Sequence, residues 1–310
     1  MDRRIKFRHL DAFSAIARAG SLKSAAAELN LSQPSISKTL KELEDILDVA
    51  LMERDRSGAR LTREGEVFLQ FAEQCTSALR HGLRSVRSGG GSAAHLKVGV
   101  LPSIASSLLP RAVLSFSKSD PDTLLELHEG SHHDLTSRLR SGRLDLVVGR
   151  LGRPDTMQGL VFRQLYTEEV IVVAAPGSPA ASVRRFEDLD AFRVLYPPKD
   201  SAIRPLVARM LIARGVPLFG NRIETASAAV GRALTLADPG IVWVISRGVV
   251  SCDLAEGRLV ELPIGTGPTV GAVGIMSLAD EVPTTAVRAF SNALQRAARD
   301  PAAMHQASMS

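Results

Sequence analysis

The sequence predicts two kinds of fold in one chain: an N-terminal domain dominated by α-helices and a larger C-terminal region of α/β architecture. Three observations predict this division. Before residue 88, apolar residues recur every three or four positions, which is typical of amphipathic helices. After residue 92, short Val, Leu and Ile runs alternate with helical stretches, which indicates a layered, mostly parallel α/β fold. Between them lies Ser88-Gly89-Gly90-Gly91-Ser92, whose composition is that of a flexible linker.

Four helices and a β wing are expected in the N-terminal part. Gly20 ends the first helix, Ser32 caps the third, and Pro34 is tolerated in a first helical turn, where no backbone donor is lost. The helices are expected at 7–19, 24–29, 32–47 and 62–86, and the wing at 51–54 and 60–61. The third helix should bury Ile36, Leu40, Leu43 and Leu47 and leave a polar face exposed.

Helix, short helix, tight turn, polar-faced helix and wing together predict a winged helix-turn-helix that reads double-stranded DNA. A helix fits the major groove and its first residues reach base edges. Gln33 suits bidentate pairing with adenine, Ser35 and Ser37 are adaptable, and the cations suit phosphates. The predicted DNA-binding residues are Lys23, Ser32, Gln33, Pro34, Ser35, Ser37, Lys38, Lys41, Arg54, Arg56 and Arg60. Any one of these residues alone is more simply explained as a solvated surface residue.

The long fourth helix carries apolar residues at heptad-like spacing. They are Phe68, Ala72, Cys75, Leu79, Gly82 or Leu83, and Val86. This spacing favours a dimer-forming coil, and packing on its own domain is the alternative.

Seven strands are expected beyond the linker. They are 96–101, 123–127, 144–149, 170–175, 193–196, 240–245 and 270–276. In open α/β sheets, ligands bind at the carboxyl ends of strands, where helix N-termini present free backbone donors.

The stretch from Phe7 to Glu66 resembles the LysR-type transcriptional regulators. It contains AAAELNLSQPSISKTLKELEDIL followed by LMERDRSGARLTREGE. The segments RRIKFRHLDAF, LKVGVLPS, DLVVGRL and SAIRPLVARMLIARGV extend the resemblance to the subgroup that activates protocatechuate catabolism, the regulators of the pca operon. A neighbouring subgroup with similar segments responds to galactose.

The resemblance implies a two-lobed effector-binding domain like the periplasmic binding proteins, with crossovers near Thr167 and Val270. It places the DNA-binding domain at 1–61, a dimerisation helix at 62–88, a hinge at 89–94 and the effector domain at 95–310. Lobe I would comprise 95–168 and 271–298, and lobe II would comprise 169–270. The implied partners are promoter DNA, RNA polymerase, a second or further copies of the chain as homodimer or homotetramer, and a small acidic effector such as carboxymuconate.

The predicted effector-binding residues follow strands or begin helices. They are Ser103, Gly130, Ser131, Arg150, Ser201, Thr225 and Ser227. A serine or threonine here is a candidate hydroxyl ligand, and Arg150 is a candidate bidentate partner for a carboxylate. Ordinary helix capping is the alternative for the hydroxyl residues, and an interlobe or surface ion pair is the alternative for Arg150.

Nothing in the sequence predicts an enzyme, a metal site or a cofactor. Ser35–Lys38 and Ser115–Lys118 match S-x-x-K without its companion motifs. His128, His132, His133 and Asp134 are close in sequence but need not converge on a metal, and Gly265-Thr266-Gly267 is a lone G-x-G. A small-molecule sensor without DNA function is the remaining alternative.

The composition limits the class of protein and the number of domains. The chain has 310 residues, of which 45% are hydrophobic and 23% charged, and its net charge is +5. This is a globular composition with room for two or three domains. Cys75 and Cys252 lie too far apart for a CxxC pair, so reduced thiols are expected. The lack of a long apolar run and of a signal peptide predicts a cytoplasmic protein without a membrane partner.

Overall fold

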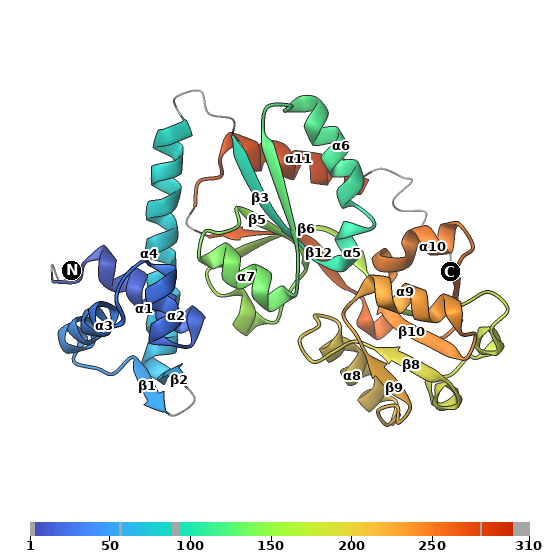
Figure 1. The fold of residues 1–310 in the computed structure, drawn as a ribbon. Helices are drawn as coiled ribbons and strands as arrows, with labels where there is room; N and C mark the ends of the chain where they lie inside the picture. Colours follow the sequence, from blue (N-terminus) through green and yellow to red (C-terminus); the bar gives the residue numbers. More distant parts are fainter. Residues whose placement is uncertain (1–3, 56–57, 89–93, 280, 300–310) are drawn as a thin grey trace. The chain divides into compact units, whose positions relative to one another are not determined.

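The computed structural model describes residues 4–55, 58–88, 94–279 and 281–299 (Figure 1). The chain forms two compact units, one built mainly from the N-terminal residues up to Ser92 and one from the residues after it. Within the described residues, no helix combines the length and the apolar character needed to cross a membrane.

Three helices form the body of the N-terminal unit: α1 (Phe7–Ala19), α2 (Leu22–Glu28) and α3 (Gln33–Leu47). The first ends at Gly20, whose φ of 63° is the left-handed conformation that glycine adopts without strain. The second begins two residues earlier than expected, because Ser21 caps it by accepting the Ser24 amide. The third begins as predicted, since the Ser32 hydroxyl accepts the Ser35 amide at 3.3 Å.

The core of this unit lies between α1 and α3. Ile36, Leu40 and Leu43 are buried, as the spacing predicts, and they form one cluster with Phe13 and Ile16. Leu47, also expected in the core, is only half-buried and packs against this cluster. Because one face of α3 is used for this packing, its opposite face is left to solvent.

The wing consists of β1 (Met52–Asp55) and β2 (Gly58–Leu61), paired antiparallel. Thr62 then caps α4 (Arg63–Ser88), because its hydroxyl accepts the Gly65 amide at 2.9 Å. The apolar residues at heptad-like spacing on α4 fall into two groups. Phe68 and Ala72 pack into the domain's own core, whereas Leu79 and Leu83 are exposed.

The C-terminal unit is built from alternating strands and helices. In chain order they are β3 (His95–Val100), α5 (Pro102–Ala105), α6 (Leu109–Ser119), β4 (Leu124–Glu129), α7 (His132–Arg140), β5 (Leu146–Arg150), η1 (Pro154–Met157), β6 (Leu160–Glu168), β7 (Val170–Ala174), η2 (Pro179–Ser182), η3 (Phe186–Ala191), β8 (Arg193–Tyr196), α8 (Arg204–Ala213), β9 (Arg222–Glu224), α9 (Ala228–Ala237), β10 (Ile241–Ser246), η4 (Arg247–Val250), α10 (Ser251–Ala255), β11 (Val260–Glu261), η5 (Gly267–Thr269), β12 (Gly271–Leu278) and α11 (Thr285–Arg299).

These elements make two five-stranded sheets, which define lobe I and lobe II. The lobe I sheet has the strand order β4-β3-β5-β12-β6, and the lobe II sheet has the order β11-β7-β10-β8-β9. The chain passes from one sheet to the other between β6 and β7, and back again between η5 and β12. We call these two connections the crossovers.

The expectation of a mostly parallel sheet is wrong, because both sheets are mixed. In lobe I, β3 runs parallel to β4 and β5, but β12 runs antiparallel to β5 and β6. In lobe II, β8 runs parallel to β9 and β10, but β7 runs antiparallel to β10 and β11. A strand that enters directly from the other lobe has no crossover helix to restore the parallel direction.

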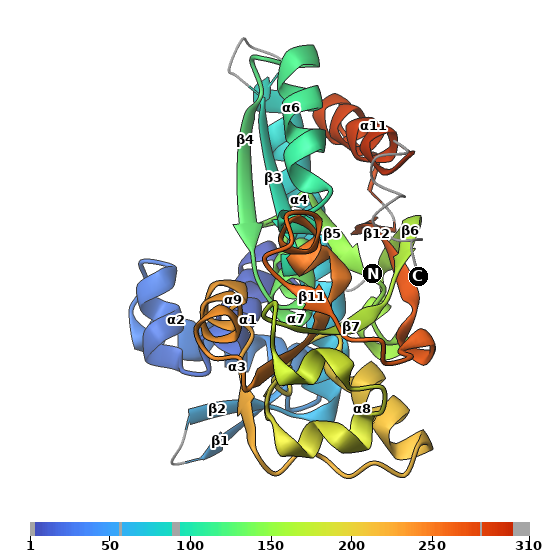
Figure 2. The ribbon, with the colours of Figure 1, turned by 90° about the vertical axis from the view of Figure 1, so that its right-hand side faces the viewer.

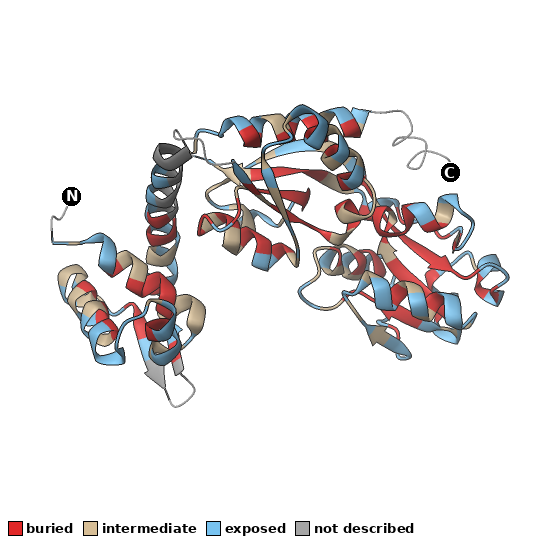
Figure 3. Ribbon diagram, turned by 45° about the horizontal axis from the view of Figure 1, so that its top comes forward, coloured by how far each residue is buried: buried red, intermediate tan, exposed pale blue. Residues whose placement is uncertain are grey.

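Helices cover both faces of each sheet (Figures 1 and 2). In lobe I, α6 and α11 pack on one face, where Phe116 and Phe290 meet edge to face with ring centroids 5.2 Å apart. In lobe II, α9 packs closely against Trp243, because a Cβ on Gly231 would lie 2.4 Å from that indole ring. The interior strands, such as β5 in lobe I and β7 and β10 in lobe II, are accordingly among the most buried segments, whereas the edge strands are partly exposed (Figure 3).

Candidate DNA interface and effector site

The polar face of α3 is exposed as predicted. Among the predicted DNA-binding residues, the exposed ones are Ser32, Gln33, Pro34, Ser35, Lys38 and Lys41, together with Lys23 on α2 and Arg60 on β2. Ser37 is half-buried. Arg56 and the side chain of Arg54 lie outside the described residues. The structure therefore presents amide, hydroxyl and ammonium groups on a single helix face beside the wing.

Two acidic residues on α3 hold this helix in place. The Glu44 carboxylate accepts the amides of Leu51 and Met52 at 2.8 and 3.1 Å, which fixes the start of the wing against the end of α3. Glu42 pairs with Arg8 at 3.0 Å, and the buried His9 ring of α1 lies 3.4 Å from the same carboxylate oxygen. Neither role was predicted from the sequence, although Glu44, an acid in the last turn of α3, was a visible signal.

The arrangement matches what major-groove reading requires. A rigid helix carries short polar groups at its N-terminal end, where base edges are reached, and lysines further along, where phosphates lie. Because Ile36, Leu40 and Leu43 are fixed in the core on the other side, the exposed face has one orientation within this unit.

The predicted effector-binding residues gather at two sheet edges. Ser103 follows β3, and Gly130 and Ser131 follow β4, so they share the carboxyl edge of the parallel part of the lobe I sheet. Ser201 follows β8, and Thr225 and Ser227 follow β9, at the corresponding edge of lobe II. The two edges face each other, because α5 of lobe I contacts η4 of lobe II.

The hydroxyl residues differ in what they already do. Ser227 caps α9 by accepting the Val230 amide, and Ser131 accepts the Asp134 amide at the start of α7, so the capping alternative describes both. The Ser227 amide in turn donates to the Thr225 hydroxyl at 3.1 Å. Ser103 is different: it lies inside the first turn of α5, and its buried side chain does not cap that helix.

The structure does not place Arg150 where a carboxylate ligand would reach it. Its side chain is buried, and Nη2 lies 3.3 Å from Oε2 of the equally buried Glu168. Arg150 therefore belongs to a buried ion pair within lobe I, which is neither the interlobe nor the surface pair that the sequence offered as the alternative to effector binding. Glu168 was missed because it lies 18 residues from Arg150, at the end of β6, a strand that the sequence did not predict.

Burial raises the pKa of the Glu168 carboxyl above its usual value, because a charge loses solvation in the interior. The Arg150 guanidinium and the Gly248 amide act in the opposite direction. Burial also raises the pKa of the neighbouring Tyr166 phenol.

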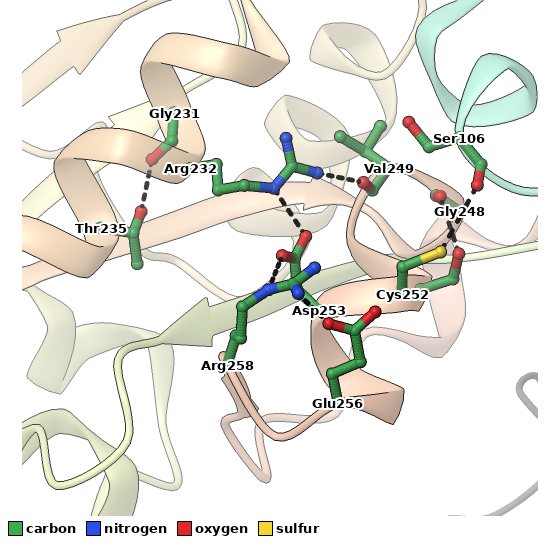
Figure 4. Close-up of polar contacts among 11 residues, drawn as sticks. Ser106, Gly231, Arg232, Thr235, Gly248, Val249, Cys252, Asp253, Glu256 and Arg258 are labelled. Atoms are coloured by element: carbon green, nitrogen blue, oxygen red, sulfur yellow. Dashed lines mark hydrogen bonds and ion pairs between the residues drawn. The ribbon is translucent and has the colours of Figure 1, made fainter.

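Beside α5, η4 and α10 are held firmly in lobe II (Figure 4). Arg232 of α9 donates to the Val249 carbonyl at 3.0 Å and to the buried Asp253 carboxylate at 2.8 Å. Arg258 donates to the other oxygen of Asp253. The Cys252 thiol points toward lobe I, with its sulfur 3.7 Å from the Ser106 carbonyl oxygen.

The histidines that lie close together in the sequence do not converge on one point in the described structure. His128 pairs with Glu126, whereas the His132 ring contacts the Thr156 hydroxyl at 3.3 Å. Asp134 lies 3.7 Å from Arg138 along α7. In the described ranges, the geometry brings together no group of three or more His, Cys, Asp or Glu side chains suited to a metal ion.

Comparisons with known proteins match both units. Residues 7–66 match the family model described as "Bacterial regulatory helix-turn-helix protein, lysR family". Residues 89–299 match the model described as "LysR substrate binding domain".

Full-length relatives agree with this match. The HTH-type transcriptional regulator PcaQ of Agrobacterium fabrum is 42% identical over 301 residues, which cover 96% of each chain. The HTH-type transcriptional regulator YdcI of Escherichia coli K12 is 33% identical over 299 residues, covering 94% of this chain and 96% of that one.

Solved structures share the fold. A full-length OxyR variant from Pseudomonas aeruginosa aligns with a TM-score of 0.63 at 24% identity, covering 94% of this chain and 95% of that one. CbnR, a LysR family transcriptional regulator, aligns with a TM-score of 0.58 at 22% identity, covering 96% and 100%. At these identities the likeness concerns the fold alone.

Proposed function

Because the chain belongs to the LysR family of DNA-binding transcriptional regulators, we propose that it activates genes of protocatechuate catabolism in response to an acidic ring-cleavage metabolite. The observation that supports the protocatechuate pathway is the 42% identity of this chain to PcaQ over almost the whole of both chains. The effector would bind between the facing edges of the two lobes and change their arrangement, which alters contacts with DNA and RNA polymerase.

The proposed DNA contacts are divided by chemistry. Gln33 at the exposed start of α3 reads a base, and Lys38, Lys41 and Arg60 neutralise phosphates. Lys23, Ser32, Pro34, Ser35, Ser37, Arg54 and Arg56 complete the proposed interface. The exposed Phe71, Leu79 and Leu83 side chains of α4 support pairing with a second copy as a dimer or a dimer of dimers.

Replacing Gln33 by alanine should lower affinity for the promoter upstream of the gene by about ten- to a hundredfold, since a bidentate base contact is worth about 1–3 kcal/mol. Affinity for random duplex should not change. Lys38→Gln is the matched control, because a lost phosphate contact weakens binding to all duplexes and lowers the salt slope by about 1. Fluorescence anisotropy over a salt series measures both. Equal binding of the wild-type protein to promoter and random duplex at physiological salt would refute the proposal.

The effector class is tested separately by thermal unfolding of the full chain with ring-cleavage acids and sugars. We propose that Ser103, Gly130, Ser131, Ser201, Thr225 and Ser227 form the site, where backbone amides and hydroxyls suit a carboxylate. Near-saturating carboxymuconate should raise the unfolding midpoint by about 5–10 °C, and galactose should leave it unchanged. The converse result would assign the chain to the sugar-responsive branch.

A further inference from the structure

The Arg150 guanidinium holds both crossovers of the effector-binding unit at once. Its Nη1 donates to the Glu168 carbonyl of the first crossover at 2.9 Å and to the Thr269 carbonyl of the second at 3.3 Å. Its Nη2 pairs with the Glu168 carboxylate. The space is tight on this side, because a Cβ on Gly271 would lie 2.7 Å from Nη1.

The Glu168 carboxylate extends this contact into lobe II. Its Oε1 accepts the Gly248 amide of η4 at 2.9 Å. A Cβ on Gly248 would lie 2.4 Å from that oxygen and 2.5 Å from the Ser103 carbonyl, so only glycine lets η4 approach so closely. Glu168 therefore lies where the Ser103 segment of lobe I meets η4 of lobe II.

The Gly248 end of this contact is anchored in lobe II by ion pairs and hydrogen bonds. Arg247 forms a bidentate pair with Glu261 at 2.8 and 2.7 Å and also pairs with Glu169. Arg232 fixes the next residue of η4 through the Val249 carbonyl. A rotation of one lobe against the other at the crossovers must therefore change the distance from the Gly248 amide to Glu168.

We propose that Glu168 is the positioning residue of the effector response: its carboxylate, held by Arg150, sets the register between α5 and η4 and thereby the resting arrangement of the lobes. The inference rests on the proposed function for its link to the effector, although its structural part stands without it. A buried ion pair adds little net stability over well-packed apolar residues, so its effect here is to select one arrangement.

Hydrogen exchange of the full-length protein tests the structural part. In Glu168→Gln the acceptor loses its charge, and the Gly248 amide should exchange about tenfold faster, while the amides of Val242 and Val244 inside β10 keep their wild-type rates. A role confined to general stability would instead speed exchange throughout both sheets. Glu224→Gln is the control for hydrogen exchange, because that carboxylate pairs with Arg204 and Arg222 away from the crossovers.

The double variant R150M/E168M keeps the experiment informative should the single variant fold poorly, since it removes both buried charges together. It should unfold like the wild type yet lose protection at Gly248. Unchanged Gly248 exchange in both variants would overturn the proposal.

The effector link is measured on the same variants with carboxymuconate as the probe. In Glu168→Gln the concentration that gives half-maximal promoter activation should shift about tenfold. If the carboxymuconate concentration for half-maximal promoter activation does not shift, the proposed link between Glu168 and the effector response is overturned. Absence of any wild-type response to carboxymuconate would instead refute the proposed effector class, and hydrogen exchange would then decide the role of Glu168 alone.

Discussion

Replacing Arg150 by methionine should lower the free energy of unfolding of the effector-binding unit by about 3–5 kcal/mol. Both side chains of the pair are at most 4% exposed, so the substitution leaves the Glu168 charge buried without its partner. The two crossover carbonyls lose their donor at the same time. Denaturant titration followed by the fluorescence of Trp243, the single tryptophan of the chain, reports this unit.

Two further variants serve as controls for the stability loss in Arg150→Met. R150M/E168M should recover most of the lost stability, since an apolar pair of similar volume replaces the buried ion pair. Arg222→Met removes a pair whose side chains are about 30% exposed and should cost less than about 1 kcal/mol. A loss below about 1 kcal/mol in Arg150→Met would show that the interior accommodates the unpaired carboxylate.

Replacing Gly65 by alanine should destabilise the N-terminal unit by about 1–3 kcal/mol or more. A Cβ there would lie 2.0 Å from the Leu51 carbonyl oxygen, so backbone rather than a flexible side chain would have to move. Leu51 is also where Glu44 fixes the start of the wing, so the wing should shift and DNA affinity should fall as well. Thermal unfolding by circular dichroism and promoter binding measure the two effects.

Gly82→Ala is the control on the same helix. Nothing lies within 4 Å of a Cβ at Gly82, and alanine is the better helix former, so this variant should gain about 0.5–1 kcal/mol. Equal effects of the two substitutions would show that the contact between α4 and Leu51 is not tight in solution.

The N-terminal unit could be predicted closely because its determinants are local. The spacing of Ile36, Leu40 and Leu43 identifies the buried face of α3, and Ser32 and Thr62 cap helices through residues three positions away. Which of the heptad-spaced apolar residues of α4 join the core was not predictable in this way. Phe68 is drawn into the core by Phe13, a contact between residues far apart in the sequence.

The sheets of the effector-binding unit were less predictable. Strand β6 was missed because Arg163 and Gln164 interrupt its apolar pattern, which an edge strand tolerates since one face meets solvent. Strands β9 and β11 are only three and two residues long, too short to show periodicity. The antiparallel entry of β7 and β12 depends on where the chain changes lobes, and no local residue pattern encodes it.

The candidate sites also differed in how far they could be predicted from local sequence. Exposed positions on α3 could be predicted from one face of one helix, whereas the environment of Arg150 depends on Glu168 and Thr269, far away in sequence. An arginine after an apolar strand has the same local sequence whether it faces a ligand or a buried carboxylate.

The position of β12 between β5 and β6 has a consequence for the order of synthesis. The winged helix-turn-helix and α4 are complete once residue 88 has left the ribosome, but the lobe I sheet lacks an interior strand until residues 271–278 emerge. Because domains fold as they are made, the nascent chain carries a finished winged helix-turn-helix long before its effector-binding unit can fold. A premature stop before β12 would therefore release a DNA-binding fragment with an incomplete lobe I.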